Sequence, residues 1–318
     1  MPTPLEPAPE LGELLGLEGL WLKREDLSPE GSHKGRAMDV MVAGLLQDGG
    51  DQAVISSSGN AALAAGARCQ EHGVRLLSLV SPSTPGVKLR RLVAARGSVV
   101  ISRRPVELLH HAAGAWGLAD LRASTNPLGP VAYRQIAAEL AAAGEWAQVF
   151  VFSSSGATAL GIAQGFGALG ASVPTINPVE GAPGGELTRP WYPGAPIAEP
   201  AGVGELGTRK SRLAPLLRRA VRASGGRGWR VSRGDLLETR RLAEQVGLQT
   251  SWEGLAALAA AHTAAASGVG SKGRCLVLLT GAAWQLDLEP AAEELAPTAD
   301  SPAELDSILE AAGFRRAR

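Results

Sequence analysis

Short apolar runs alternate with longer amphipathic stretches along most of this chain. Runs rich in β-branched and large apolar residues predict strands at 53–56, 75–80, 98–101, 148–152, 229–232 and 275–279. Ala-rich stretches with helical periodicity predict helices at 60–72, 86–95, 105–116, 131–143, 158–169, 212–223, 234–246, 252–266 and 302–312. Strands that alternate with helices over such a length predict an α/β fold, in which open twisted parallel sheets carry helices on both faces.

The strands and helices form two series, and these predict two lobes with a cleft between them. The first series ends near residue 116, and the second begins near residue 131. Within the second series, residues 177–207 are rich in glycine and proline, and we expect a structured surface loop at 181–208. The acidic tail after Asp287 is expected either to dock on the fold or to be solvated.

Two of the predicted strands end in serine- and glycine-rich turns that lead into helices. Strand 53–56 is followed by Ser57, Ser58, Gly59 and Asn60, and strand 148–152 is followed by Ser-Ser-Ser-Gly-Ala-Thr at 153–158. Backbone N–H groups at a helix N-terminus attract carboxylates and phosphates. A single such turn is more often an ordinary serine cap. Two of them could bind two anions at once, such as a cofactor phosphate and a substrate carboxylate.

Lys34 stands at the predicted start of a further helix. Only five of the 31 lysine and arginine residues are lysines, and Lys34 comes shortly after a Pro-Glu-Gly-Ser turn. A lysine amine can lose its proton and attack a carbonyl, which the guanidinium of arginine cannot do. A solvated lysine at a helix end is the plainer interpretation of this segment alone. Together with the two turns, Lys34 becomes a candidate for covalent catalysis.

Composition narrows the class of protein. The 318 residues are 45% hydrophobic, enough for a large core, and the formal net charge is zero. Basic residues are scattered or lie on a solvated helix face within 208–233, with little aromatic interleaving, so we expect no nucleic-acid partner. No apolar run approaches the roughly 18 residues of a membrane span, and no secretory signal is visible. Cys69 and Cys275 are isolated, and His110 and His111 lack a third ligand, so we expect a cytoplasmic protein without disulfides or a metal site.

Five segments of the chain occur in the order found in one enzyme superfamily. They are Leu22-Lys23-Arg24-Glu25-Asp26-Leu27 with Gly31-Ser32-His33-Lys34-Gly35-Arg36, Ser57-Ser58-Gly59-Asn60, the turn 153–158, Ser251-Trp252-Glu253-Gly254-Leu255-Ala256-Ala257, and Leu278-Leu279-Thr280-Gly281. Together they resemble the fold-type II pyridoxal-phosphate enzymes, the tryptophan synthase β-like superfamily that includes threonine synthase, serine/threonine dehydratase and cysteine synthase. The resemblance covers most of the chain. It departs from the usual pattern at Ala157, which replaces a glycine of the phosphate loop.

The resemblance implies a role for each segment. Lys34 would form a Schiff base with pyridoxal 5'-phosphate and then act as the base at the α-carbon. The residues implied in cofactor binding are His33, Asn60, Ser154, Ser155, Gly156, Ala157, Thr158, Glu253 and Thr280. The substrate carboxylate would be held by Ser57, Ser58, Gly59 and Asn60. A neutral hydroxyl such as that of Thr280 opposite the pyridine nitrogen leaves this nitrogen largely unprotonated, which suits elimination or replacement better than transamination.

The resemblance also implies how the chain is divided. Residues 1–45 plus 128–318 would form a large cofactor-binding domain, and residues 46–127 a smaller, mobile substrate-binding domain. The cofactor would lie in the cleft between them, and the enzyme would be a homodimer.

The function expected from these features is pyridoxal-phosphate-dependent elimination or replacement on a small amino acid, as in threonine synthase-like or serine/threonine dehydratase-like lyases. A phosphorylated substrate would need a second basic pocket, for which Arg134, Arg189 and Arg209 are candidates. The alternative is a non-catalytic paralogue of the same fold that binds an amino acid or the cofactor. The retention of Lys34, Asn60 and Thr280 speaks against this alternative.

Overall fold

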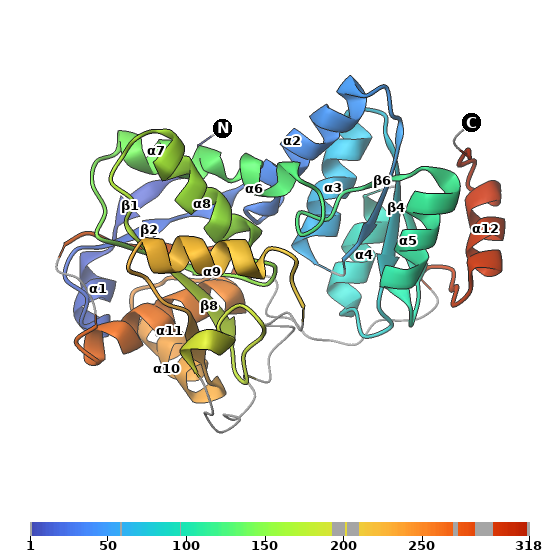
Figure 1. The fold of residues 1–318 in the computed structure, drawn as a ribbon. Coiled ribbons are helices and arrows are strands. Elements are labelled where there is room, and N and C mark those ends of the chain that lie inside the picture. The colour runs from blue at the N-terminus through green and yellow to red at the C-terminus, as the bar shows by residue number, and fades with distance from the viewer. Residues whose placement is uncertain are drawn as a thin grey trace. The chain divides into compact units, whose positions relative to one another are not determined.

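The computed structural model describes residues 2–57, 59–95, 97–192, 201, 210–269, 273–283 and 295–316. The chain divides into two compact units: unit 1 comprises Met1–His33 and Gly129–Leu286, and unit 2 comprises Lys34–Leu128 and Asp287–Arg318. Each unit has its own sheet with helices (Figure 1), which confirms the predicted α/β fold class. The cofactor-binding and substrate-binding roles assigned to 1–45 plus 128–318 and to 46–127 stay predictions.

The sheet of unit 1 has six strands in the order β1-β2-β10-β7-β8-β9. Their bounds are β1 Leu5–Pro7, β2 Leu20–Lys23, β7 Gln148–Phe152, β8 Thr175–Gly181, β9 Trp229–Val231 and β10 Cys275–Leu278. All neighbours run parallel except the edge strand β1, which is antiparallel to β2. Strands β7 and β10 are buried along their whole length, as expected where helices cover both faces of a parallel sheet.

The helices of unit 1 pack on this sheet and on one another. They are α1 Pro9–Leu15, α6 Leu128–Ala132 at the unit boundary, α7 Arg134–Ala142, α8 Ala157–Ala168, α9 Ala214–Ala223, α10 Arg233–Gln245 and α11 Trp252–Ala266, with short 3₁₀ turns η1 Glu25–Leu27 and η2 Arg189–Trp191. Helix α11 is apolar around nearly its whole circumference, and it packs against β7, β8, β9 and β10 in the core.

Helix α8 lies unusually close to the preceding helices. A Cβ atom at Gly161 would lie 2.3 Å from the carbonyl oxygen of Pro130, and one at Gly165 would lie 2.6 Å from the Cβ of Ala137. The helix predicted at 131–143 is in fact the two helices α6 and α7, which meet at the fully buried Tyr133. Glycine is therefore needed in α8 to bring these backbones together.

Strand β8 was missed by the sequence prediction, because most of it falls within the glycine- and proline-rich stretch 177–207. The strand contains buried polar residues, so it does not stand out in the sequence as an apolar run. Residues distant in sequence supply the hydrogen-bond partners of these polar side chains. Asn177 accepts a hydrogen bond from Trp229 Nε1 at 3.1 Å, and Glu180 accepts one from the Thr188 hydroxyl at 2.7 Å. Pro178 lies before the residues that pair with β9.

Unit 2 contains a four-stranded parallel sheet in the order β5-β4-β3-β6. Its strands are β3 Gln52–Ser56, β4 Arg75–Val80, β5 Ser98–Ile101 and β6 Ala119–Asp120. Its helices are α2 Lys34–Gln47, α3 Asn60–Glu71, α4 Gly86–Ala94, α5 Pro105–Trp116 and α12 Pro302–Ala311. None of the described helices in either unit is long and apolar enough to cross a membrane.

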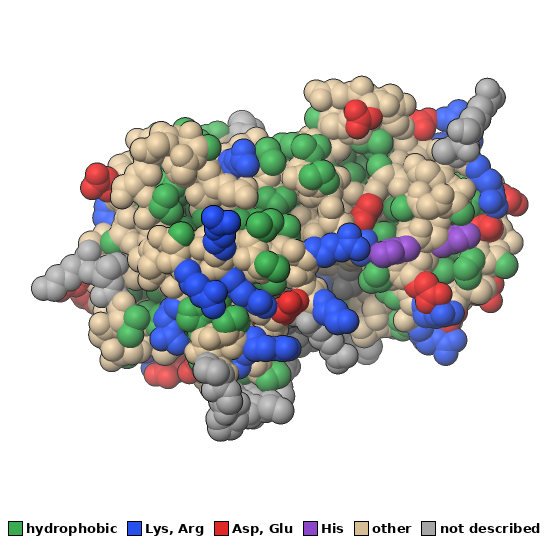
Figure 2. All heavy atoms as spheres, viewed as in Figure 1, with side chains coloured by type: hydrophobic (Ala, Val, Ile, Leu, Met, Phe, Trp, Pro, Cys, Tyr) green, Lys and Arg blue, Asp and Glu red, His purple; other side chains and the backbone are tan. Residues whose placement is uncertain are grey.

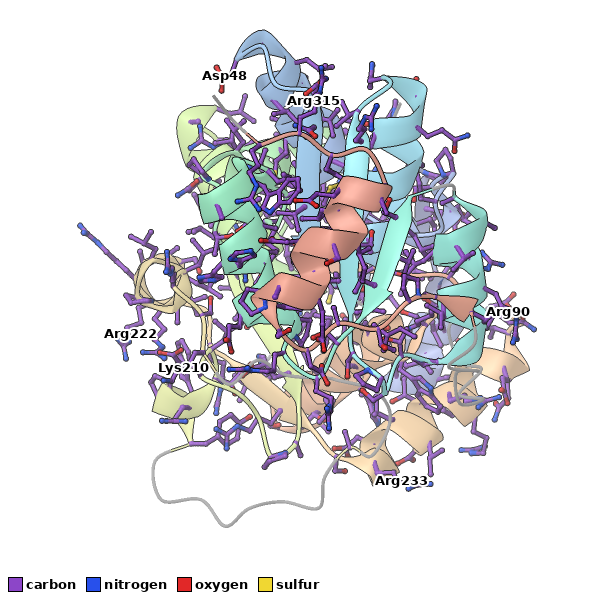
Figure 3. All side chains as sticks on the ribbon, turned by 90° about the vertical axis from the view of Figure 1, so that its right-hand side faces the viewer. Asp48, Arg90, Lys210, Arg222, Arg233 and Arg315 are labelled. Atoms are coloured by element: carbon purple, nitrogen blue, oxygen red, sulfur yellow. The ribbon has the colours of Figure 1, made fainter. Side chains whose placement is uncertain are left out.

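The C-terminal helix α12 docks on unit 2, one of the two outcomes expected for the tail; it faces the viewer in Figure 3. Leu305 and Leu309 join a buried cluster that includes Trp116 of α5. Asp306 accepts hydrogen bonds from Trp116 Nε1 and His111 Nε2, each at 2.7 Å. His111 therefore contributes to this docking contact.

Candidate active site

Helix α8 begins directly after the serine-rich turn that follows β7. Its N-cap residue is Gly156, and among the described residues no side chain caps it. Helices α10, α11 and α12, by contrast, are each capped by a serine hydroxyl. The first turn of a helix has N–H groups without intrahelical partners, and together with the helix dipole they attract an anion. Several other described helices also lack a side-chain cap, so what marks this turn is its position after β7 together with its hydroxyls, of which that of Ser155 accepts from the N–H of Ala157 at 3.5 Å.

Gly156 gives this turn its shape. Its φ of +86° lies in the left-handed region, and a Cβ there would approach Leu217 Cδ2 to 2.9 Å. Ala157 is the first residue of α8, where φ is negative, so the alanine that departs from the family pattern carries no backbone strain.

The residues of this turn fit a phosphate. The segment 153–158 has no acidic side chain, and it carries the hydroxyls of Ser154, Ser155 and Thr158. Ser154 and Ser155 are half-buried, while Thr158 is buried in the first turn of α8. Neutral donors at a helix N-terminus are the usual means of binding a phosphate through the backbone.

Three segments of unit 1 meet at the carboxyl end of β10. The backbone N–H of His33 donates to the carbonyl oxygen of Thr280 at 3.3 Å, and His33 Nδ1 donates to the same oxygen at 3.0 Å. The next carbonyl, that of Gly281, accepts from the N–H of Ser251 at 2.8 Å and from the Thr250 hydroxyl at 3.0 Å. Tertiary structure therefore brings His33, Thr280 and the segment that starts at Ser251 together, while their roles toward the cofactor stay predictions.

The contact with Thr280 fixes the protonation of one ring nitrogen of His33. A carbonyl oxygen only accepts, so Nδ1 must carry the hydrogen, and in the neutral ring Nε2 is then the acceptor nitrogen. The imidazole is 5% exposed and lies 5.4 Å from the Tyr133 ring, centroid to centroid. The side chain before Lys34 is thus held in one orientation and one tautomer.

Lys34 is the first residue of α2 and belongs to unit 2. Its side chain is half-buried, and the two residues after it, Gly35 and Arg36, are buried. His33, the residue before Lys34 in the sequence, is the last residue of the first segment of unit 1. The helix predicted to begin at this lysine is present.

The second predicted anion turn lies in unit 2 between β3 and α3. Gly59 is the N-cap of α3 and donates to the Ser57 hydroxyl at 3.3 Å, and no side chain of the described residues caps the helix. Asn60, half-buried, is the first residue of α3, which packs against α2 within this unit. Ser58 lies outside the described residues. The helices that begin at Lys34 and at Asn60 are therefore neighbours.

Comparison with known proteins decides the family. The family model described as "Pyridoxal-phosphate dependent enzyme" matches residues 1–281. The chain belongs to this family. Its cofactor is accordingly pyridoxal 5'-phosphate, as predicted.

One relative and three solved structures are similar to this chain. A biosynthetic chloroplastic threonine dehydratase of Solanum lycopersicum is 37% identical over 100 residues, which span 31% of this chain and only 16% of that protein. Maize serine racemase superposes with a TM-score of 0.75 at 16% identity, covering 89% of each chain. O-ureido-L-serine synthase gives 0.72 at 19% identity, over 89% of this chain and 90% of the other. The processed form of threonine deaminase isoform 2 from Solanum lycopersicum gives 0.70 at 19% identity, over 98% and 84%. These structural likenesses show the fold.

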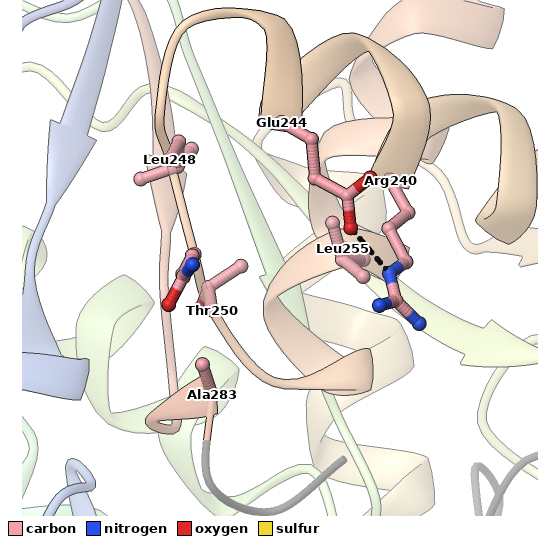
Figure 4. A pocket seen from close by; sticks show the side chains of 7 residues that line it. Arg240, Glu244, Leu248, Thr250, Leu255 and Ala283 are labelled. Carbon is pink, nitrogen blue, oxygen red and sulfur yellow. Dashed lines mark hydrogen bonds and ion pairs between the residues drawn. The ribbon is translucent and has the colours of Figure 1, made fainter.

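Glu253 of this pyridoxal-phosphate enzyme lies half-buried in the first turn of α11, whose N-terminus is capped by Ser251. Its assignment to the cofactor stays a prediction. A surface hollow of about 350 Å³ lies nearby (Figure 4), with Arg240 Nε 2.7 Å from Glu244 Oε1 at its edge. The predicted site residues are not among those that line it, which are Arg240, Glu244, Leu248, Gln249, Thr250, Leu255 and Ala283.

Sequence reasoning missed one contact of the phosphate turn. The hydroxyl of Ser211 donates to the carbonyl oxygen of Ser155 at 2.6 Å, across 56 residues of chain. Nothing in the sequence around Ser211 signals this contact, because the residue stands in a basic segment without a recognisable motif.

Arginines gather over α9, as Figure 2 shows, and tertiary structure supplies the aromatic rings that are scarce beside them in sequence. The guanidinium of Arg222 lies 5.7 Å from the Trp191 ring, and that of Arg230 lies 4.6 Å from the Tyr192 ring.

Of the candidates for a second basic pocket, Arg134 is exposed and donates to Gln164 at 3.2 Å. Arg189 is exposed on η2, and Arg209 lies outside the described residues.

Proposed function

We propose that this enzyme catalyses elimination or replacement at the side chain of a small hydroxy amino acid, with Lys34 as the residue that binds the cofactor covalently. The observation that carries the proposal is the pair of hydrogen bonds that hold His33 on the carbonyl of Thr280, immediately before Lys34. Within unit 1 they hold the residue before Lys34 at the strand end that carries the hydroxyl predicted to face the pyridine nitrogen.

Pyridoxal phosphate, when bound, supplies an aldehyde that condenses with an amine and a ring that accepts electron density from the α-carbon. The turn at 153–158 would hold its phosphate through the N–H groups of α8 and the hydroxyls of Ser155 and Thr158. Lys34 Nζ would remove the α-proton, which needs an amine held neutral by its surroundings. The substrate carboxylate would lie at the N-terminus of α3, on the N–H groups near Gly59 and Asn60.

The type of reaction follows from the residue at 280. A threonine hydroxyl is neutral, so it does not stabilise a protonated pyridine nitrogen as a carboxylate would. The ring is then a weaker electron acceptor, which suits loss of a leaving group from the side chain more than transamination. The likeness to a threonine dehydratase supports this direction.

The division of labour between domains and the oligomer belong to the same proposal. Residues 1–45 plus 128–318 would bind the cofactor, and residues 46–127 would bind the substrate carboxylate and move during turnover. The active species would be a homodimer, which analytical ultracentrifugation of the holoenzyme tests.

The test combines trapping with turnover. We expect the protein to absorb where the ultraviolet meets the visible region, and we expect borohydride to remove this band. Peptide mapping should then find the trapped cofactor on a peptide that contains Lys34. The release of a keto acid should be measured with four candidate substrates: L-serine, L-threonine and the O-phosphorylated form of each. Lys34→Ala and Lys34→Arg should abolish both trapping and turnover, while the exposed Lys210→Ala retains both. Undiminished turnover in Lys34→Ala would overturn the covalent role. A wild-type protein that stays colourless with added cofactor would favour the non-catalytic paralogue.

A further inference from the structure

The hydroxyl of Ser211 joins two stretches of backbone that are distant in sequence. It donates to the carbonyl oxygen of Ser155 at 2.6 Å and accepts from the N–H of Leu213 at 3.1 Å. Because a carbonyl only accepts and a backbone N–H only donates, both roles of the hydroxyl are fixed. Ser211 is only 9% exposed, so water competes little for this contact.

The contact controls the direction of one peptide group in the phosphate turn. In a planar trans peptide the C=O and the N–H point in opposite directions. Since the carbonyl of Ser155 points at Ser211, the N–H of Gly156 must point away from Ser211. Glycine adopts positive and negative φ with similar ease, so at a φ of +86° the Ser155–Gly156 peptide has a second, flipped orientation within reach.

Ser211 is itself held in place by its neighbours. Its backbone N–H donates to Glu186 Oε2 at 2.8 Å. The other carboxylate oxygen of Glu186 lies 3.5 Å from Arg218 Nη2, and the same guanidinium donates to the carbonyl of Glu186. Arg218 belongs to α9, next to Leu217, whose side chain packs under Gly156. The position of Ser211 is thus set by a chain of contacts that starts on α9.

We propose that Ser211 is a positioning residue that selects the orientation of the Ser155–Gly156 peptide in which the N–H, not the carbonyl oxygen, faces the cofactor phosphate. A flipped peptide would turn a partial negative charge toward the phosphate and remove one donor. The inference rests on the proposed function, because it takes the turn at 153–158 as the phosphate site.

The experiment compares two ligands that differ only in the phosphate. Apo-protein is titrated with pyridoxal phosphate and with pyridoxal, and binding is followed by absorbance and tryptophan fluorescence. In Ser211→Ala the affinity for pyridoxal phosphate should fall about tenfold, while that for pyridoxal stays within about twofold. Ser211→Thr, which keeps the hydroxyl, should restore most of the affinity for the phosphate ligand.

The matched control is Ser224→Ala. The Ser224 hydroxyl also joins two backbone stretches of unit 1, since it accepts from the Ile176 N–H at 3.1 Å and donates to the Val221 carbonyl at 2.8 Å. It has no contact with the phosphate turn among those of the described residues, so Ser224→Ala should leave the ratio of the two affinities unchanged.

The outcomes separate this inference from the proposed function. An equal loss of affinity for both ligands in Ser211→Ala, or no loss for either, would overturn the positioning role alone. A wild-type apo-protein that binds neither ligand would overturn the proposed function and this inference with it.

Discussion

The carbonyl oxygen of Thr280 accepts two hydrogen bonds from His33, one from the backbone N–H at 3.3 Å and one from Nδ1 at 3.0 Å. Almost 250 residues of chain separate these residues, yet the contact fixes the residue before Lys34 to the end of β10. Both bonds are buried, so neither partner can turn to water if the other is lost.

The first prediction removes the side-chain half of this contact. His33→Ala should lower the free energy of unfolding by ~1–2 kcal/mol, because a buried acceptor loses a donor. His33→Asn should retain much of that energy, since the amide nitrogen of asparagine can lie where Nδ1 lies. Urea denaturation of the three proteins measures the difference, and equal destabilisation by both substitutions would contradict the assigned bond.

The second prediction concerns the hydroxyl of Thr280, a residue that is 2% exposed. Thr280→Val keeps the shape but removes the hydroxyl, and should weaken cofactor binding by ~1 kcal/mol, the value of one neutral hydrogen bond. Thr280→Ser keeps the hydroxyl and should bind the cofactor nearly as well as the wild type. Equilibrium titration with pyridoxal phosphate tests both. A valine variant with unchanged affinity and absorption spectrum would count against the role of this hydroxyl.

The third prediction tests the backbone of the phosphate turn. Gly156→Ala should lower the free energy of unfolding by ~1–2 kcal/mol, because the left-handed φ at this position disfavours a residue with a Cβ. The added Cβ would also collide with Leu217. It should also weaken the binding of pyridoxal phosphate. The control is Gly167→Ala in the same helix, where a Cβ meets nothing within 4 Å and alanine should gain up to ~1 kcal/mol. Thermal unfolding of both variants measures their stability relative to the wild type. A Gly156→Ala protein with unchanged stability and full cofactor affinity would refute the prediction.

The fourth prediction is a dependence of stability on pH through Asp306. Burial alone would raise the pKa of this carboxyl, but hydrogen bonds from His111 and Trp116 outweigh burial and hold the pKa below its ordinary value of 3.8. A lowered pKa in the folded state means that the ionised form stabilises the docking of α12. This stabilisation is complete above the unfolded-state pKa and is lost as the pH falls through the folded-state pKa.

The matching experiment is urea denaturation of the wild type and of Asp306→Asn at about pH 7 and about pH 3. The variant should be less stable at the higher pH, and the difference from the wild type should shrink at the lower pH. If the difference in the free energy of unfolding between wild type and variant is the same at both pH values, ionisation of Asp306 does not contribute to stability.

The fifth prediction is that both cysteines are chemically inert in the folded protein. Burial raises the pKa of the Cys69 thiol and of the Cys275 thiol to about 12 each, so the reactive thiolate is scarce near neutral pH. A thiol reagent such as DTNB should therefore label neither residue in the native enzyme and both after denaturation. Rapid labelling of the native enzyme would contradict the burial of these side chains.

The local pattern of the chain determined most of its secondary structure. Strands β4, β5 and β7 and helices α5 and α11 have the bounds that periodicity predicts, because apolar spacing and turn residues act over a few neighbouring positions. The same local logic located the two turns at helix N-termini, and the order of the motifs pointed to the family and its cofactor. The assignment of Lys34 and the other site residues to roles stays a prediction.

Tertiary structure alone decided strand β8 and the contacts made across long stretches of chain. Asn177 and Glu180 look unsuited to a buried strand until Trp229 and Thr188 supply their hydrogen-bond partners. The bond from Ser211 to Ser155 likewise has no counterpart in any local pattern. Periodicity and capping report only on forces between near neighbours in sequence. The partner of a buried polar group is chosen by how whole elements pack, and this depends on the fold as a whole.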